Sequence, residues 1–422
     1  MPEASSDHTF VNVPQCRNLQ VRNLCSVFVA VLWGAMLLAA CVLAVRGMLA
    51  QSAGSSNVLG AASSNVSRTT EARLKAPGWW PTKAVRSRDE YVGAAECAKC
   101  HASQAAVIQS TAMNRAATRA PESESLRQNE HLALQIGPYQ YQITSSGGKN
   151  VLRISKAGAS VSAVLGWAFG MGRIAQTYVY EQNGSFYESH LSFYTAPQAL
   201  DITPGHPRTV PPSLVEGAGR RMTIQETRRC FGCHTTGSTA KNPFDPQTLV
   251  LGVTCEACHG PGGDHVAAAK SGMDELVPGS IVNPARMNPV ESVDFCGACH
   301  RTWQDVVSDS PVRTGTLNVR FTPYRLENSR CWNKGDARIT CLACHDPHQP
   351  LVLDPASYDS RCLQCHTAAG TKKSEDHSGT ACPVGIRLCV TCHMPKFRNP
   401  LLHATFTDHW IRIAPPGAPL PD

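Results

Sequence analysis

The stretch Cys341-Leu-Ala-Cys344-His345-Asp-Pro-His348 contains the pattern that decides the fold, two cysteines three positions apart with a histidine directly after the second. This pattern, Cys-x-x-Cys-His, occurs seven times in the 422 residues and uses 14 of the 19 cysteines. With this composition, chance would supply about 0.03 copies. The copies span 97–101, 230–234, 255–259, 296–300, 341–345, 362–366 and 389–393. Seven copies therefore indicate that the pattern has the same chemical role at each position.

The spacing within each copy suits the covalent attachment of haem c. Cysteines three positions apart on a helical turn lie on one face about 5–6 Å apart, which suits thioether bonds to the two vinyl groups of one haem. The histidine that follows then points its imidazole at the iron. Zinc would need two cysteine pairs per ion and has no use for a histidine after every pair. Seven redox-active dithiols in one chain would be unusual.

We therefore predict seven covalently bound haems c. The cysteines predicted to bind them are Cys97, Cys100, Cys230, Cys233, Cys255, Cys258, Cys296, Cys299, Cys341, Cys344, Cys362, Cys365, Cys389 and Cys392. The predicted proximal iron ligands are His101, His234, His259, His300, His345, His366 and His393.

The composition fits a protein whose core contains something besides side chains. Only 6% of the residues are aromatic, and 17% are charged against a usual value of about 25%. Porphyrin faces would supply apolar surface, so we expect the apoprotein to be largely unfolded. Seven haems would also bring propionates with a total charge of up to about −14. We expect the lysines and arginines behind the net charge of +7 to pair with propionates, and no nucleic-acid motif is present.

The second axial position of each iron needs a further ligand. Eight histidines outside the motifs are candidates: His131, His190, His206, His265, His348, His377, His403 and His409. His265 and His348 follow a motif histidine too closely to reach the far side of the same iron, so we expect each of them to ligate a neighbouring haem. His403 and His409 near the end of the chain are likewise favoured, and a surface role is the alternative for any single histidine.

The N-terminal part predicts export. Residues 24–45 form a largely apolar, uncharged stretch between Arg22 and Arg46, long enough to cross a bilayer. The preceding arginines place the bulk of the chain on the periplasmic side of a bacterial inner membrane. A lipoprotein site at Cys41 and a cleaved signal peptide are the alternatives. An oxidising compartment would also allow a disulfide between Cys331 and Cys382.

The motif positions predict a mainly α fold with much irregular loop, a multihaem array that includes a small inserted antiparallel β module. The first two motifs start 133 positions apart, and alternating residues between them indicate strands, with Asn183-Gly184 as a hairpin turn. This module is interpreted as a lid over the first haem or as a docking surface. The expected organisation is 1–50 anchor, 51–78 flexible tether, 79–136 first haem segment, 137–200 β-rich insert and 201–422 six-haem array.

Four phrases carry a resemblance to a known family. They are Cys-His-Gly-Pro-Gly-Gly-Asp-His (258–265), Thr-Cys-Leu-Ala-Cys-His-Asp-Pro-His (340–348), Cys-His-Met-Pro-Lys (392–396) and Phe-Thr-Asp-His-Trp-Ile-Arg (406–412). From about Tyr91 to Arg412 the chain resembles exported multihaem cytochromes of the cytochrome c554-like group. Similar proteins have a methionine or histidine a short helix beyond the first motif, which implies Met113 as an axial ligand, with a core methionine as the alternative. Methionine ligation would raise the potential of its haem.

The sequence is compatible with two functions. The chain is expected to relay electrons between a redox protein or quinol-oxidising complex at the membrane and a periplasmic acceptor. Alternatively, one iron without a second ligand acts on a small nitrogen or sulfur compound. The number of spare histidines favours the relay, and no Cys-x-x-Cys-Lys motif, which pentahaem nitrite reductases usually carry, is present.

Overall fold

The computed structural model describes residues 87–238, 245–308, 315–332, 339–367, 370–371, 382 and 384–421. The predicted membrane anchor, the tether and His377 lie outside these residues. Within the described part of the chain, no helix combines the length and the apolar character that crossing a bilayer requires.

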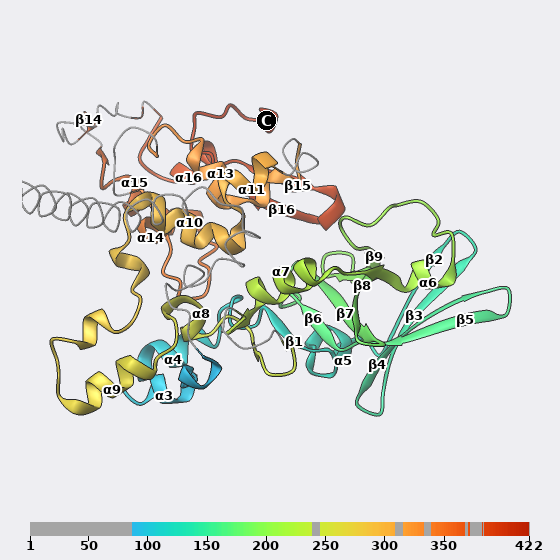
Figure 1. Cartoon of the computed structure of the whole chain (residues 1–422). Helices are drawn as coiled ribbons and strands as arrows, with labels where there is room; N and C mark the ends of the chain where they lie inside the picture. Colours follow the sequence, from blue (N-terminus) through green and yellow to red (C-terminus); the bar gives the residue numbers. More distant parts are fainter. Residues whose placement is uncertain are drawn as a thin grey trace, which may run out of the picture. The chain divides into compact units, whose positions relative to one another are not determined.

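Short helices contain all or part of each Cys-x-x-Cys-His copy (Figure 1). They are α3 (Ala94–Ala98), α7 (Ile224–His234), α8 (Cys255–His259), α10 (Pro289–His300), α14 (Cys341–Cys344), α15 (Asp359–Cys362) and α16 (Cys389–His393). Helix α7 begins with a capping box between Thr223 and Glu226, and α10 begins with Asn288 as its N-cap and a proline as its first residue. Both helices end at a motif histidine, so local sequence signals place that histidine.

Other short elements connect the motif helices. The helices are α4 (Ala102–Ile108), α5 (Glu124–Gln128), α6 (Leu214–Ala218), α9 (Gly263–Ser271), α11 (Trp303–Ser308) and α13 (Thr322–Glu327). Single-turn 3-10 helices include η1 (Arg88–Glu90), η3 (Val277–Gly279), η5 (Asn318–Arg320) and η6 (Pro355–Tyr358). Three ribbons pair β11 (Thr235–Thr236) with β12 (Val250–Leu251), β13 (His366–Thr367) with β14 (Gly370–Thr371), and β15 (Lys396–Asn399) with β16 (Ala404–Thr407). The 32 glycines and 29 prolines of the chain favour such short elements.

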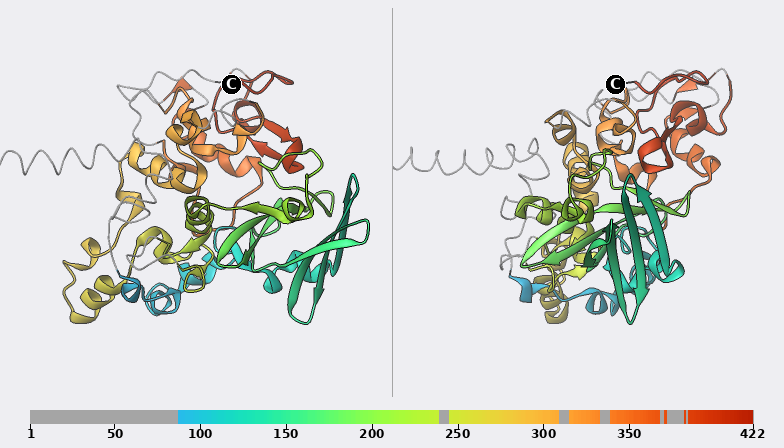
Figure 2. Two further views of the ribbon diagram at one scale, coloured as in Figure 1. Left: turned by 45° about the vertical axis from the view of Figure 1, so that its right-hand side comes forward. Right: turned by 90° about the vertical axis from the view of Figure 1, so that its right-hand side faces the viewer.

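Two antiparallel sheets form a β region, residues 117–221 (Figure 1). The first sheet is a meander of β2 (His131–Ile136), β3 (Tyr139–Ser146), β4 (Lys149–Lys156) and β5 (Ala159–Val164). The second has the order β1 (Ala117–Arg119), β6 (Trp167–Phe169), β7 (Ala175–Gln182), β8 (Ser185–Tyr194) and β10 (Gly219–Arg221), with β9 (Ala199–Ile202) also paired to β8. Figure 2 shows both sheets from two further sides.

The hairpin turn expected at Asn183-Gly184 connects β7 and β8, where Gln182 is paired with Ser185. Both turn residues have positive φ, 51° and 69°, as a two-residue turn that matches the strand twist requires. In β3, buried Tyr139, Tyr141 and Ile143 alternate with exposed residues. The period-2 pattern therefore directs one face of this strand into a core.

One apolar cluster combines side chains from both sheets. It includes Tyr141 and Leu152 of the meander with Tyr178 and Leu191 of the second sheet, and all four are fully buried. A second cluster lies on Trp167, Phe169 and Val179 and includes Phe231 of α7. The ring of Phe231 meets Trp167 and Phe169 edge to face, at 5.4 and 5.0 Å between centroids. The second cluster therefore packs the helix of the second motif directly against the sheet.

The observed strands extend beyond the expected 137–200 insert at both ends. Strands β1 and β2 precede it, and β10 follows it. Strands β1 and β10 have three residues each and take their conformation from pairing with β6 and β8. Three residues are too few to show an alternating pattern, so these partners were not visible in the sequence.

Candidate haem-binding sites

Three pairs of histidine rings face each other in the described part of the chain. The ring centroids lie 6.3 Å apart for His101 and His265, 6.0 Å for His259 and His348, and 6.3 Å for His345 and His409. Two imidazoles on opposite sides of one metal ion should have centroids about 6.3 Å apart, from about 2 Å per metal–nitrogen bond and about 1.1 Å from nitrogen to ring centre. All three spacings therefore fit a single iron between the rings.

Each of these pairs joins a motif histidine to a histidine that comes later in the chain. His265 follows the third motif but faces the first, and His348 follows the fifth motif but faces the third. This is the crossed arrangement expected from their short distance to the preceding motif histidine. His409 near the C-terminus faces the histidine of the fifth motif, with an angle of 40° between the ring planes.

Backbone carbonyls hold several of these rings through the Nδ1 atom. The Nδ1 atoms of His234, His259 and His393 lie 2.9, 2.8 and 3.0 Å from the carbonyl oxygens of Ala116, Val282 and Arg412. Those of His265 and His409 lie 3.1 Å from the carbonyl oxygens of Val277 and Thr407. An Nδ1–H that donates to a carbonyl leaves Nε2 as the lone-pair nitrogen and fixes the direction of the ring.

Burial favours the neutral imidazole in five of the candidate iron ligands. It lowers the pKa of His409 to about 4. Burial also lowers the pKa values of His234, His259, His300 and His345 below the usual 6.5. A neutral imidazole is the form that binds iron, so these rings are ready for a metal at neutral pH.

Cysteines of different motifs lie next to each other. Their side chains form hydrogen-bonded pairs between Cys97 and Cys255, Cys233 and Cys299, Cys296 and Cys341, and Cys362 and Cys389. Cys258 and Cys299, and likewise Cys344 and Cys362, are close enough to interact electrostatically. These interactions connect all seven motifs into one network. It runs from the first motif through the third, fourth, fifth and sixth to the seventh, and the second is attached to the fourth.

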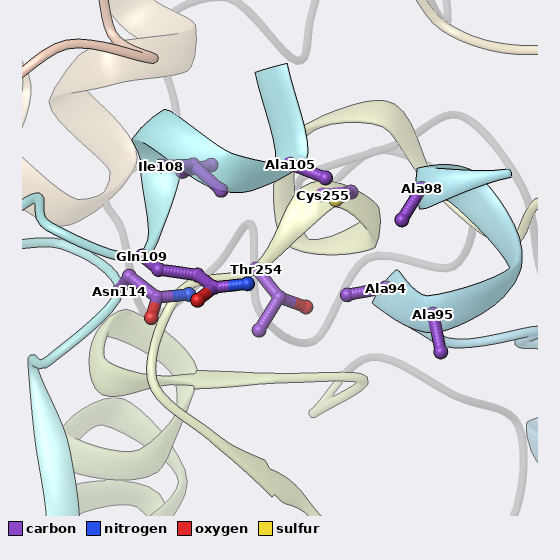
Figure 3. Close-up of a pocket in the computed structure, with 9 residues that line it drawn as sticks. All are labelled: Ala94, Ala95, Ala98, Ala105, Ile108, Gln109, Asn114, Thr254 and Cys255. Atoms are coloured by element: carbon purple, nitrogen blue, oxygen red, sulfur yellow. The ribbon is translucent and has the colours of Figure 1, made fainter. Parts of the chain in front are cut away.

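A small cavity lies beside the first of these cysteine pairs (Figure 3). Its volume is about 200 Å³, and the side chains that line it include Ala98, Ala105, Ile108 and Cys255 from α3, α4 and α8. Ligand pockets usually enclose about 300–1,000 Å³. Its walls include small apolar side chains, which leave open space beside Cys255 of the third motif.

His403 contacts two residues of the β region and faces no other histidine ring in the described part of the chain. Its Nε2 lies 2.8 Å from Oδ2 of Asp201 at the end of the β region, and its ring packs edge to face on Tyr194. The Nε2 atom of His403 is therefore engaged with a carboxylate in the structure. Asp201 is 202 positions away in the chain, so sequence spacing could not reveal this pairing.

His190 and His206 bind each other inside the β region. Their Nδ1 atoms are 3.2 Å apart, and Nε2 of His206 lies 3.1 Å from Oε2 of Glu188. Arg220 donates to the same carboxylate at 2.9 Å. Burial lowers the pKa of His190 to about 4. These two histidines are thus engaged in a polar network of the sheet, which the histidine count alone could not show.

The structure places the remaining predicted residues in different surroundings. His131 is exposed at the start of β2. Met113 is half-buried, and its carbonyl accepts a hydrogen bond from the backbone of Val253 at 2.9 Å. The ring that faces His101 belongs to His265, so Met113 stays an untested alternative as the ligand of the first motif. Cys382 is an exposed free thiol, so the predicted disulfide with Cys331 is not formed in the structure.

Comparison with known proteins gives three partial similarities and no matching solved structure. The family model "Cytochrome c554 and c-prime" matches residues 213–260, which contain the second and third motifs. Multiheme cytochrome MtrA of Shewanella baltica is 25% identical over 175 residues, 35% of this chain and 50% of that protein. Cytochrome c-554 of Nitrosomonas europaea is 33% identical over 91 residues, 19% of this chain and 37% of that protein.

The chain thus spans half or less of the length of the curated relatives it matches. What the two relatives have in common is that both are cytochromes, and the family model is built on cytochromes as well. The similarities agree with the repeated motifs and with the facing histidine rings. Together these similarities support a multihaem c-type cytochrome, a class of protein that binds haem c covalently.

Proposed function

We propose that this chain is an exported, membrane-anchored cytochrome with seven haems c that relays electrons between a membrane donor and a periplasmic redox partner. The observation that carries the proposal is the continuous series of close cysteines of different motifs, four pairs hydrogen-bonded and two near enough to interact electrostatically. Cysteines that touch would hold their haem edges close together. Bound haem c supplies one-electron chemistry, because its iron alternates between the ferric and ferrous states.

The residues of the chain would then have three tasks. The motif cysteines would hold each porphyrin edge, and the facing rings, such as His259 and His348, would occupy both axial positions of an iron. The carbonyls that accept from Nδ1, such as that of Val282, would fix the ring and raise its basicity as a ligand. An iron with two histidine ligands has no open position for a substrate, which suits transfer of electrons without further chemistry.

The location and partners follow from the sequence. The apolar stretch of residues 24–45 would anchor the chain in the inner membrane, and residues 51–78 would act as a tether. The expected donor is a redox protein or a quinol-oxidising complex at that membrane. The MtrA similarity supports a partner of the redox type.

A second candidate function has one observation in its favour. Within the part of the chain that the structure describes, no second histidine ring faces His234, His300 or His393 at the spacing of the three pairs. An iron at one of these positions with only one protein ligand could bind a small nitrogen or sulfur compound. The alternative is therefore a multihaem oxidoreductase with one open iron.

The deciding experiment uses full-length protein made in cells that attach haem c. A pyridine haemochrome assay and intact mass should give seven haems per chain, and the EPR spectrum of the ferric protein should be dominated by low-spin signals. Seven low-spin haems would support the relay. A high-spin signal near one haem equivalent, together with turnover of nitrite or hydroxylamine, would favour the oxidoreductase. Fewer than seven haems would contradict both as stated, and protease treatment of spheroplasts would test the periplasmic location.

A further inference from the structure

A buried ion pair lies beside one of the candidate iron ligands. The side chains of Arg325 on α13 and Asp408 after β16 are both 0% exposed. Nε of Arg325 donates to Oδ1 of Asp408 at 2.8 Å, and Nη2 donates to Oδ2 at 2.9 Å. A guanidinium and a carboxylate that meet through two parallel bonds fix each other in direction as well as distance.

The remaining groups around Arg325 hold its guanidinium in place. Its Nη1 donates to the carbonyl of Pro421 at 2.9 Å and to Oδ1 of Asn318 at 3.3 Å. The guanidinium also lies over the ring of Trp410, 5.2 Å from its centroid. Arg325 is therefore occupied by protein groups. It is an exception to the expectation that the arginines of this chain serve haem propionates.

Asp408 directly precedes His409, and its carboxylate organises the turn that carries this histidine. Oδ1 accepts from the backbone N–H of Trp410 at 3.1 Å, and Oδ2 accepts from Nη1 of Arg412 at 2.5 Å. The backbone N–H of Asp408 donates to the carbonyl of Pro395 at 2.9 Å. The Asp408 carboxylate thus binds both the backbone of Trp410 and the side chain of Arg412, which follow His409 in the chain.

The backbone of His409 is held from the other side by Ser329. The Ser329 hydroxyl donates to the His409 carbonyl at 3.2 Å and accepts from the N–H of Ile411 at 2.8 Å. Ser329 lies four positions after Arg325, just beyond the end of α13. One short segment of the chain, residues 325–329, therefore holds the turn at 408–411 at two points.

We propose that Arg325 is a positioning residue for His409: through Asp408 it holds the imidazole opposite His345, where the two rings share one iron. Arg325 itself touches neither the iron nor its ligands. The inference rests on the proposed assignment of His345 and His409 to the haem of the fifth motif. It adds a residue that neither the motif pattern nor the cytochrome similarities assign to a haem.

The test compares full-length holoprotein variants by EPR and optical spectroscopy. Arg325→Lys keeps the charge but loses the two parallel bonds, and Asp408→Asn keeps the shape but weakens the acceptor. His409→Ala is the reference that removes the ligand. Leu152→Ala, a fully buried position in the core of the β region, controls for general loss of stability.

We expect Arg325→Lys and Asp408→Asn to convert up to one haem equivalent from low spin to high spin, and added imidazole to restore it. In the His409→Ala background neither change should add further high-spin iron, because both act through the same ligand. Leu152→Ala should keep the wild-type spin state. If folded Arg325→Lys and Asp408→Asn keep the wild-type spin state, or if their effects add to that of His409→Ala, the positioning role is refuted. The assignment of His409 as a ligand is not affected by that result. If His409→Ala itself leaves the wild-type spectrum, the ligand assignment is refuted and the inference with it.

Discussion

Two histidines that look equivalent in the sequence, His348 and His403, should respond in opposite ways to replacement by alanine. His348 and His403 are both favoured axial ligands from their positions in the chain. In the structure, His348 faces His259 with ring centroids 6.0 Å apart, whereas Nε2 of His403 lies 2.8 Å from the Asp201 carboxylate. Replacing each by alanine therefore separates the structural assignment from the one based on sequence position.

His348→Ala should leave one iron without its second ligand. The nitrogen that is lost would lie about 4 Å from Nε2 of His259, from two metal–nitrogen bonds of about 2 Å each, and the alanine methyl group cannot reach that point. His101 and His265, which interact electrostatically with His259, face each other and are therefore not expected to replace it. One haem in seven, about 14% of the ferric iron, should change from low spin to high spin.

His403→Ala should change no spin state. It removes a partly exposed ion pair, in which the His403 and Asp201 side chains are 28% and 22% exposed. Pairs with this degree of exposure contribute about 0–1 kcal/mol to stability. The assay is the EPR spectrum of each ferric variant with its haem content, before and after addition of imidazole. If His403→Ala produced a haem equivalent of high-spin iron while His348→Ala left the spectrum unchanged, the assignment from ring geometry would be refuted.

Three further predictions test other parts of the molecule. Phe231→Ala should destabilise the holoprotein by about 3–5 kcal/mol in chemical denaturation, because the ring is 0% exposed and packs on Trp167 and Phe169; a loss below about 1 kcal/mol would contradict this packing. The pKa of His190 is lowered from 6.5 to about 4 by burial, so the unfolded chain binds its proton more readily. This group therefore costs no stability above pH 6.5 and destabilises the fold progressively as the pH falls towards 4, by at most about 3–4 kcal/mol. His190→Phe should flatten the stability–pH profile in that window, which denaturation at several pH values would reveal. Chain made without haem attachment should lack a cooperative thermal transition by circular dichroism, and a sharp transition like that of the holoprotein would show that haem does not form part of the core.

The sequence alone was sufficient to predict haem c chemistry. Seven repeats of a five-residue pattern specify covalent attachment because the two thioether bonds and the proximal histidine all come from one helical turn. The Asn183-Gly184 hairpin was visible for a similar reason, since a two-residue turn with positive φ at both positions is a local requirement. The crossed use of His265 and His348 was expected because each is too close to its own motif histidine to reach the far side of the same iron.

Only the tertiary structure separated the remaining histidines. His403, His190 and His206 have the same chemistry as His409, but long-range partners decide their use: Asp201 holds the first, and the other two bind each other beside Glu188. The buried pair of Arg325 and Asp408 joins residues 83 positions apart. Axial ligation and buried ion pairs depend on which segments meet in space, and an isolated histidine or arginine carries no local signal of its partner. Local sequence therefore predicts the sites of haem attachment, and long-range packing decides which histidine rings face each other.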